Sequence, residues 1–227
     1  MEMKQILLIT DGRSNVGGDP ARAAAYAAQN GITVNAVGII DGDNDVLSSD
    51  EIKAIALAGN GTWQMVPLDM LSATMCTVTY RSMHNTLENI VNAQVKKIVG
   101  SDMLDIEPAM RLPLVRYVDT LADETLLRCV ILVDCSNSMA VKLKTARAAI
   151  LDLLASFKAR RAGSNLAVIA FPGQSGSHYQ MICPFTDDVE LLKGYLNELK
   201  HRGNTPTAHA INAAISYILN DEQPLFV

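Results

Sequence analysis

The chain has 227 residues, a formal net charge of −5, and 49% hydrophobic against 19% charged residues. This composition excludes a disordered chain, and the acidic charge balance argues against a nucleic-acid-binding protein. No apolar stretch approaches the roughly eighteen residues of a transmembrane helix, and the N-terminal segment lacks the pattern of a signal peptide, so we expect a cytoplasmic protein that does not contact a membrane.

The first third of the chain alternates between predicted strands and predicted helices. Residues 6–9 form a continuous apolar run, which is typical of a strand buried on both faces of a sheet. An Asp-Pro pair at residues 19–20 marks the start of a helix, and a second buried strand follows at residues 32–40. Residues 49–51 are expected to cap the next helix, before a strand at residues 62–66. This alternation predicts βαβ units and a parallel sheet.

The middle of the chain joins this first set of elements to a second one. Residues 69–99 have helical spacing, in one helix or two, whereas residues 101–127 contain Pro108 and Pro113 and show no clear period. We therefore expect residues 101–127 to form a connector that lies across the domain. The second set comprises a strand at 129–133, a helix at 143–157, a strand at 166–171, an edge strand at 179–183, and helices at 189–199 and 208–218, with His209 expected at the surface.

Oxygen-bearing side chains follow two of the buried strands. Asp11 comes after the first strand, and Asp134 comes after the strand at 129–133 and begins the pattern Asp134-x-Ser136-x-Ser138. The carboxyl ends of parallel strands meet at one edge of a sheet, where ligands gather. Carboxylate and hydroxyl oxygens suit a hard cation such as Mg²⁺ or Mn²⁺. The alternative is that Asp134 and the two serines only cap the helix that follows them.

Three turns share this composition of carboxylates and hydroxyls: Thr10-Asp11-Gly12, Asp134-x-Ser136-x-Ser138 and Gly203-Asn204-Thr205-Pro206. Together they resemble the metal-ion-dependent adhesion site (MIDAS) of the von Willebrand factor A (VWA) domain, most of all that of magnesium-chelatase D-type subunits. The resemblance implies a doubly wound, Rossmann-like α/β fold, with helices on both faces of a mostly parallel sheet. It also implies that Ser136, Ser138 and Thr205 hold Mg²⁺ or Mn²⁺, while Asp134 and Asp11 bind the ion directly or through water.

The order of the three turns differs from the order in that family. In the family the Asp-x-Ser-x-Ser strand comes first and the Thr-Asp-Gly strand comes last. Here residues 1–95 correspond to the C-terminal half of the VWA fold and residues 128–227 to its N-terminal half. We therefore expect one circularly permuted domain, with residues 96–127 as the connector. The alternative is a swapped dimer, in which each half pairs with the complementary half of another chain.

Two functions are compatible with such a cation. In the first, the side chains leave the ion incompletely coordinated, so that an Asp or Glu of a partner protein completes its shell. The resemblance to chelatase subunits implies a chelatase- or MoxR-like AAA+ ATPase as one such partner. The alternative is a metal-dependent hydrolase, which needs a general base that the sequence does not offer beyond the two aspartates. We therefore expect a binding module without catalytic residues, rather than an enzyme.

Overall fold

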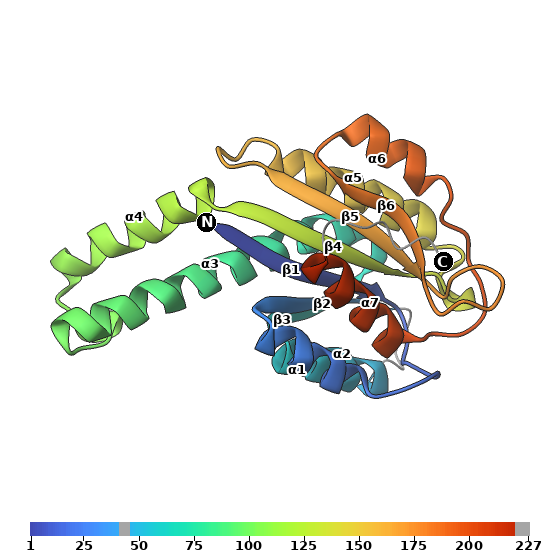
Figure 1. Cartoon of the computed structure of the whole chain (residues 1–227), viewed down its shortest axis with the longest axis horizontal. Coiled ribbons are helices and arrows are strands. Elements are labelled where there is room, and N and C mark those ends of the chain that lie inside the picture. Colours follow the sequence, from blue (N-terminus) through green and yellow to red (C-terminus); the bar gives the residue numbers. More distant parts are fainter. Residues whose placement is uncertain (41–45, 221–227) are drawn as a thin grey trace.

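A computed structural model describes residues 1–40 and 46–220 of the chain, and within these residues the strands form one sheet of six, in the order β3-β2-β1-β4-β5-β6 (Figure 1). The strands are β1 (Glu2–Thr10), β2 (Ile32–Ile40), β3 (Asn60–Pro67), β4 (Leu126–Asp134), β5 (Ser164–Phe171) and β6 (Gln180–Thr186). Neighbouring strands are parallel except for β6, which pairs with β5 in the antiparallel sense at the edge of the sheet. The predicted α/β fold with a mostly parallel central sheet is confirmed.

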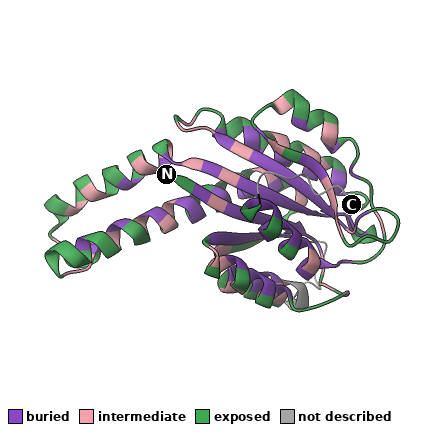
Figure 2. Cartoon of the chain, viewed as in Figure 1, coloured by how far each residue is buried: buried purple, intermediate pink, exposed green. Residues whose placement is uncertain are grey.

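Helices cover both faces of the sheet and form a separate apolar core on each. The helices α1 (Pro20–Gln29), α2 (Val46–Ala58) and α7 (Thr207–Leu219) pack on one face. The helices α3 (Leu71–Val99), α5 (Leu143–Phe157) and α6 (Val189–Leu196) pack on the other. Because both faces are covered, the central strands are buried along nearly their whole length, as Figure 2 shows. This double burial explains why these strands have continuous apolar runs instead of alternating ones.

The start of α2 differs from the prediction. The helix begins at Val46, three residues before the polar segment at residues 49–51 that was expected to cap it. Asp50 and Glu51 lie within the first turns of the helix, with Asp50 exposed and Glu51 half-buried. Polar residues are accommodated in a helix when they reach solvent, so a capping pattern in the sequence does not by itself fix where a helix starts.

The segment predicted as an irregular connector is a helical hairpin. The helix α3 continues without a break for 29 residues, and after a short 3₁₀ turn the helix α4 (Pro108–Glu124) returns alongside it. Figure 1 shows this hairpin projecting beyond the end of the sheet, so the prediction that the connector lies across the domain is wrong. The helix α4 packs mainly on α3 and buries only Val118 and Ala122 fully, which is why its sequence shows no clear amphipathic period. Among the described residues, no helix is both long and apolar enough to span a bilayer.

The strand pairing that matters for the candidate site is between β1 and β4. These two strands of the same chain are parallel neighbours, and Ile9 of β1 lies opposite Val133 of β4. Asp11 follows β1 and Asp134 is the last residue of β4, so both aspartates reach the same edge of the sheet. The C-terminal end of β5 and the start of α7 lie at this edge of the sheet too.

Candidate metal centre

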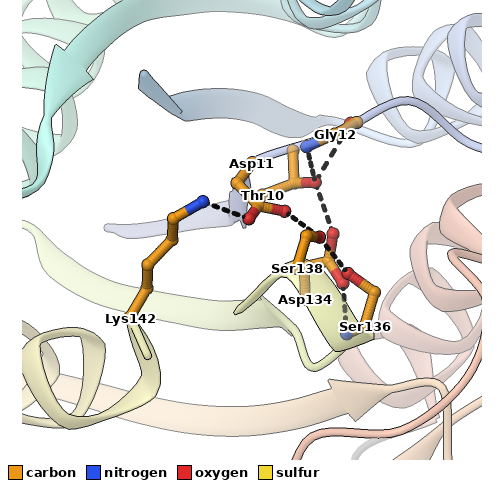
Figure 3. Close-up of polar contacts among 7 residues, drawn as sticks. All are labelled: Thr10, Asp11, Gly12, Asp134, Ser136, Ser138 and Lys142. Atoms are coloured by element: carbon orange, nitrogen blue, oxygen red, sulfur yellow. Dashed lines mark hydrogen bonds and ion pairs between the residues drawn. The ribbon is translucent and has the colours of Figure 1, made fainter. Parts of the chain in front are cut away.

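Asp134 lies at the centre of the site and is fully buried. Its Oδ2 accepts a hydrogen bond of 2.6 Å from the hydroxyl of Thr10, and its Oδ1 accepts one of 2.7 Å from the backbone N–H of Ser136 (Figure 3). The pKa of Asp134 is raised to about 6, chiefly because the carboxyl is buried and to a small extent because of the nearby charge of Asp11, while the hydrogen bonds from Thr10 and Ser136 act in the opposite direction. The two hydrogen bonds therefore fix the orientation of the carboxylate, but the protein alone compensates its negative charge poorly.

The two serines connect Asp134 to Asp11. A 3₁₀ turn over residues Asn137–Met139 brings the hydroxyls of Ser136 and Ser138 to 3.0 Å from each other. The hydroxyl of Ser138 also donates a hydrogen bond of 2.7 Å to Oδ1 of Asp11. Four of the five predicted site residues thus form one chain of hydrogen bonds between neighbouring strands, as Figure 3 shows.

Thr205 approaches the same edge from the turn that precedes α7. Its backbone N–H donates a hydrogen bond of 2.8 Å to the side-chain oxygen of Asn15, and its carbonyl accepts bonds of 3.2 Å from the backbone of Asn15 and from the hydroxyl of Ser14. These contacts tie the turn to the loop that follows Asp11. Thr205 is buried, so its position depends on the packing of the two loops.

Lys142 is a site residue that was not expected from the sequence. Its ammonium group contacts Oδ2 of Asp11 at 2.5 Å, and the exposed fractions of the two side chains are only 4% and 0%. Lys142 directly precedes α5, four residues after Ser138, and nothing in the sequence distinguishes it from a solvated lysine. The ammonium supplies one positive charge to two converging buried carboxylates.

The donor set has the chemistry that a hard divalent cation requires. Five oxygen-bearing side chains (Asp11, Asp134, Ser136, Ser138 and Thr205) come from three loops at one edge of the sheet. Two buried carboxylates against one ammonium leave a deficit of positive charge, which is costly in a buried site unless a cation offsets it. These residues therefore fit Mg²⁺ or Mn²⁺, which prefer oxygen ligands and retain some of their water.

The loop that follows Asp11 depends on a close contact at Gly17. Gly17 has a φ of +64°, and a Cβ added to it would lie 2.2 Å from Cε1 of His209. His209 is half-buried rather than at the surface as predicted, because its ring packs against this glycine and stacks on His178. The glycine thus allows the loop to lie directly on the first turns of α7.

We expect Gly17→Ala to displace the loop and to weaken cation binding. The positive φ alone costs a residue with a side chain about 1 kcal/mol, which corresponds to a lower Tm by roughly 3 °C, and the clash with His209 adds to this. Gly194→Ala on α6 is the matched control, because no described atom lies within 4 Å of the added Cβ and no positive φ is involved. Thermal unfolding and calorimetric Mn²⁺ titration measure both effects, and equal results for the two variants would contradict this account.

Comparison with known proteins places the chain in a family. Two sequence models of the von Willebrand factor type A domain match it, one over residues 129–225 and the other over residues 3–66. The uncharacterized protein YabS of Bacillus subtilis (strain 168) is 38% identical over 215 residues, which make up 93% of this chain and 87% of YabS. The crystal structure of an uncharacterized protein from Alicyclobacillus acidocaldarius is similar with a TM-score of 0.89 and 37% identity, covering 97% of this chain and 95% of that one. The chain therefore belongs to the von Willebrand factor type A domain family.

Proposed function

We propose that the chain is a metal-ion-dependent protein–protein interaction module. In this proposal Asp11, Asp134, Ser136, Ser138 and Thr205 form a MIDAS that holds Mg²⁺ or Mn²⁺, and an Asp or Glu of a partner protein completes the coordination of the ion. The observation that carries the proposal is the chain of hydrogen bonds from Asp134 through the two serines to Asp11. Membership of the VWA family supports it, because VWA domains often act as metal-dependent interaction modules.

Charge explains why a carboxylate is the expected ligand. A protein with a net charge of −5 repels acidic groups on average. Three of the five donors are neutral hydroxyls, so a bound divalent cation would keep part of its positive charge and would supply a local attraction for a carboxylate. The partner's acidic group would then bind at this edge of the sheet and at few other places.

The proposed module carries out no catalytic step. A hydrolase would need a general base beside the ion in addition to its ligands. Asp134 accepts hydrogen bonds from Thr10 and Ser136, while Asp11 accepts one from Ser138 and contacts Lys142. Both carboxylates are thus engaged in holding the site, which favours a binding module over an enzyme.

The proposal extends to the order of the two halves of the VWA fold along the chain and to the class of partner. We interpret the chain as a circularly permuted VWA domain, in which residues 128–227 correspond to the first half and residues 1–95 to the second. The two separate matches to the family, at residues 129–225 and 3–66, support this interpretation, and so does the position of β1 between β2 and β4.

The similarity of the turns to those of magnesium-chelatase D-type subunits makes a chelatase- or MoxR-like AAA+ ATPase the partner to test first.

The proposal predicts that an aspartate-containing peptide binds only when the metal is present. We expect the peptide acetyl-Gly-Asp-Gly-amide to shift NMR signals of residues around Asp11, Asp134 and Thr205 in Mg²⁺, and to cause no such shifts in EDTA. Thr205→Val keeps the size of the side chain but removes its hydroxyl, so we expect it to weaken this binding about tenfold or more.

The matched control for this experiment is Thr120→Val on α4, which removes an exposed hydroxyl that bonds only to its own helix. This variant should bind the peptide as the unaltered protein does. Signal shifts of the same size in EDTA and in Mg²⁺ would overturn the proposal, since the carboxylate would then bind without the ion.

A further inference from the structure

A pocket of about 360 Å³ opens beside the turn that carries Thr205. Asn204 and Pro206, which flank Thr205, line one side of it, and the loop from Pro172 to His178 lines the other. Val16 also lines the pocket, directly after the residue whose side chain binds the backbone of Thr205. The pocket therefore shares two loops with the candidate metal centre, and its volume is at the lower end of the range for ligand pockets.

The charged side chain in this pocket is Arg202. Its backbone N–H donates a hydrogen bond of 2.5 Å to the carbonyl of Cys135, the residue between Asp134 and Ser136. Its guanidinium donates one of 3.1 Å to Oε1 of Gln180 at the start of β6, which uses one of its five N–H donors. A planar guanidinium held in this way can bind a carboxylate through two parallel hydrogen bonds.

The imidazole of His178 adds to the polar character of the pocket. The ring of His178, which lines the pocket, stacks on the ring of His209 with a centroid separation of 4.0 Å. None of the described residues that line the pocket is acidic, so its lining is suited to an anionic group although the whole protein is acidic.

We infer that this pocket is a second subsite of the same interaction face and that it binds a second acidic side chain of the partner. The inference rests on the proposed function, in which a first acidic side chain binds at the metal centre. The partner is then a protein segment with two acidic residues close together in sequence, one for the ion and one for Arg202 and His178. Arg202 acts in this arrangement as a specificity-determining residue, because its contact makes the protein bind segments with two acidic residues more tightly than segments with one.

Synthetic peptides test the inference. The reference is acetyl-Gly-Asp-Gly-Gly-Gly-Gly-amide, and in three further peptides one Gly is replaced by Glu at one, two or three positions after Asp. In Mg²⁺ we expect at least one two-acid peptide to bind about fivefold or more tightly than the reference, as measured by NMR titration. Arg202→Gln should abolish this gain and leave the affinity for the reference peptide unchanged.

The controls separate the inference from the proposed function. Arg13→Gln removes another arginine near the metal centre, whose side chain is 56% exposed, and should preserve the gain. His178→Ala, at an exposed position, should reduce the gain and provides a second variant in case Arg202→Gln does not fold. If no two-acid peptide binds more tightly, or if the gain survives both Arg202→Gln and His178→Ala, the inference is wrong. If the reference peptide binds equally in EDTA, the proposed function itself fails.

Discussion

Asp134→Asn is expected to abolish high-affinity binding of Mg²⁺ and Mn²⁺ and to leave the fold intact. The change removes the charge at the centre of the site but keeps the size of the side chain and an oxygen for the N–H of Ser136. Loss of a group that only orients a metal ligand weakens metal binding about 10- to 100-fold, so loss of this carboxylate should weaken it by roughly 100-fold or more. Calorimetric titration measures the affinity, and circular dichroism reports the fold.

The control for this variant is Asp119→Asn, at an exposed aspartate that pairs with His84. Asp119 belongs to α4, the helix that Figure 1 shows projecting beyond the opposite end of the sheet. Its cation affinity should equal that of the unaltered protein. Unchanged Mn²⁺ binding in Asp134→Asn would show that the ion binds elsewhere, and the assignment of all five ligands would have to be abandoned.

Lys142→Met is expected to make the stability of the protein depend on the divalent cation. In EDTA this variant leaves the carboxylate of Asp11 buried without its ammonium partner, and breaking a buried ion pair in this way costs about 3 kcal/mol of unfolding free energy or more. Saturating Mg²⁺ should recover much of this loss, since the ion supplies positive charge to the same carboxylates. Urea unfolding in EDTA and in Mg²⁺ measures both free energies.

Lys144→Met serves as the matched control for this change, because Lys144 is exposed on the same helix. Its effect should remain within about 0.5 kcal/mol under both conditions. If Mg²⁺ stabilised Lys142→Met and the unaltered protein by the same amount, the ammonium and the ion would not act on the same carboxylates. Lys142 would then have no part in balancing the charge of the metal centre.

The central strands could be predicted from sequence because burial on both faces leaves a strong local signal. β1 and β4 each contain an unbroken apolar run; β4 ends at Asp134, and Asp11 directly follows β1. Once the sheet is taken as parallel, the convergence of Asp11 and Asp134 at one edge requires only that the two strands are near each other. That they are direct neighbours follows from no local pattern in the sequence.

Other features could not be predicted because they depend on contacts between distant segments. The helix α4 contains Pro113 and rests mainly on α3, so its sequence carries neither a clean helical period nor a strong apolar face. The contact of Lys142 with Asp11 joins residues 131 positions apart and depends on the 3₁₀ turn that redirects the chain after Ser136. A long flexible side chain near a motif is usually solvated, and only the completed fold shows that this one is buried.

The central position of β1 has a consequence for how the chain folds during synthesis. Of the six described strands β1 is synthesised first, yet it pairs on one side with β2 and on the other with β4, which ends only at residue 134. Until then one edge of a strongly apolar strand stays unpaired, and such edges promote aggregation. The two strands are separated by more than a hundred residues, so their pairing is a slow, non-local step.

The hairpin of α3 and α4 forms from local contacts and returns the chain to the start of β1, where β4 begins (Figure 1). Early formation of this hairpin would therefore shorten the time for which the edge of β1 is exposed.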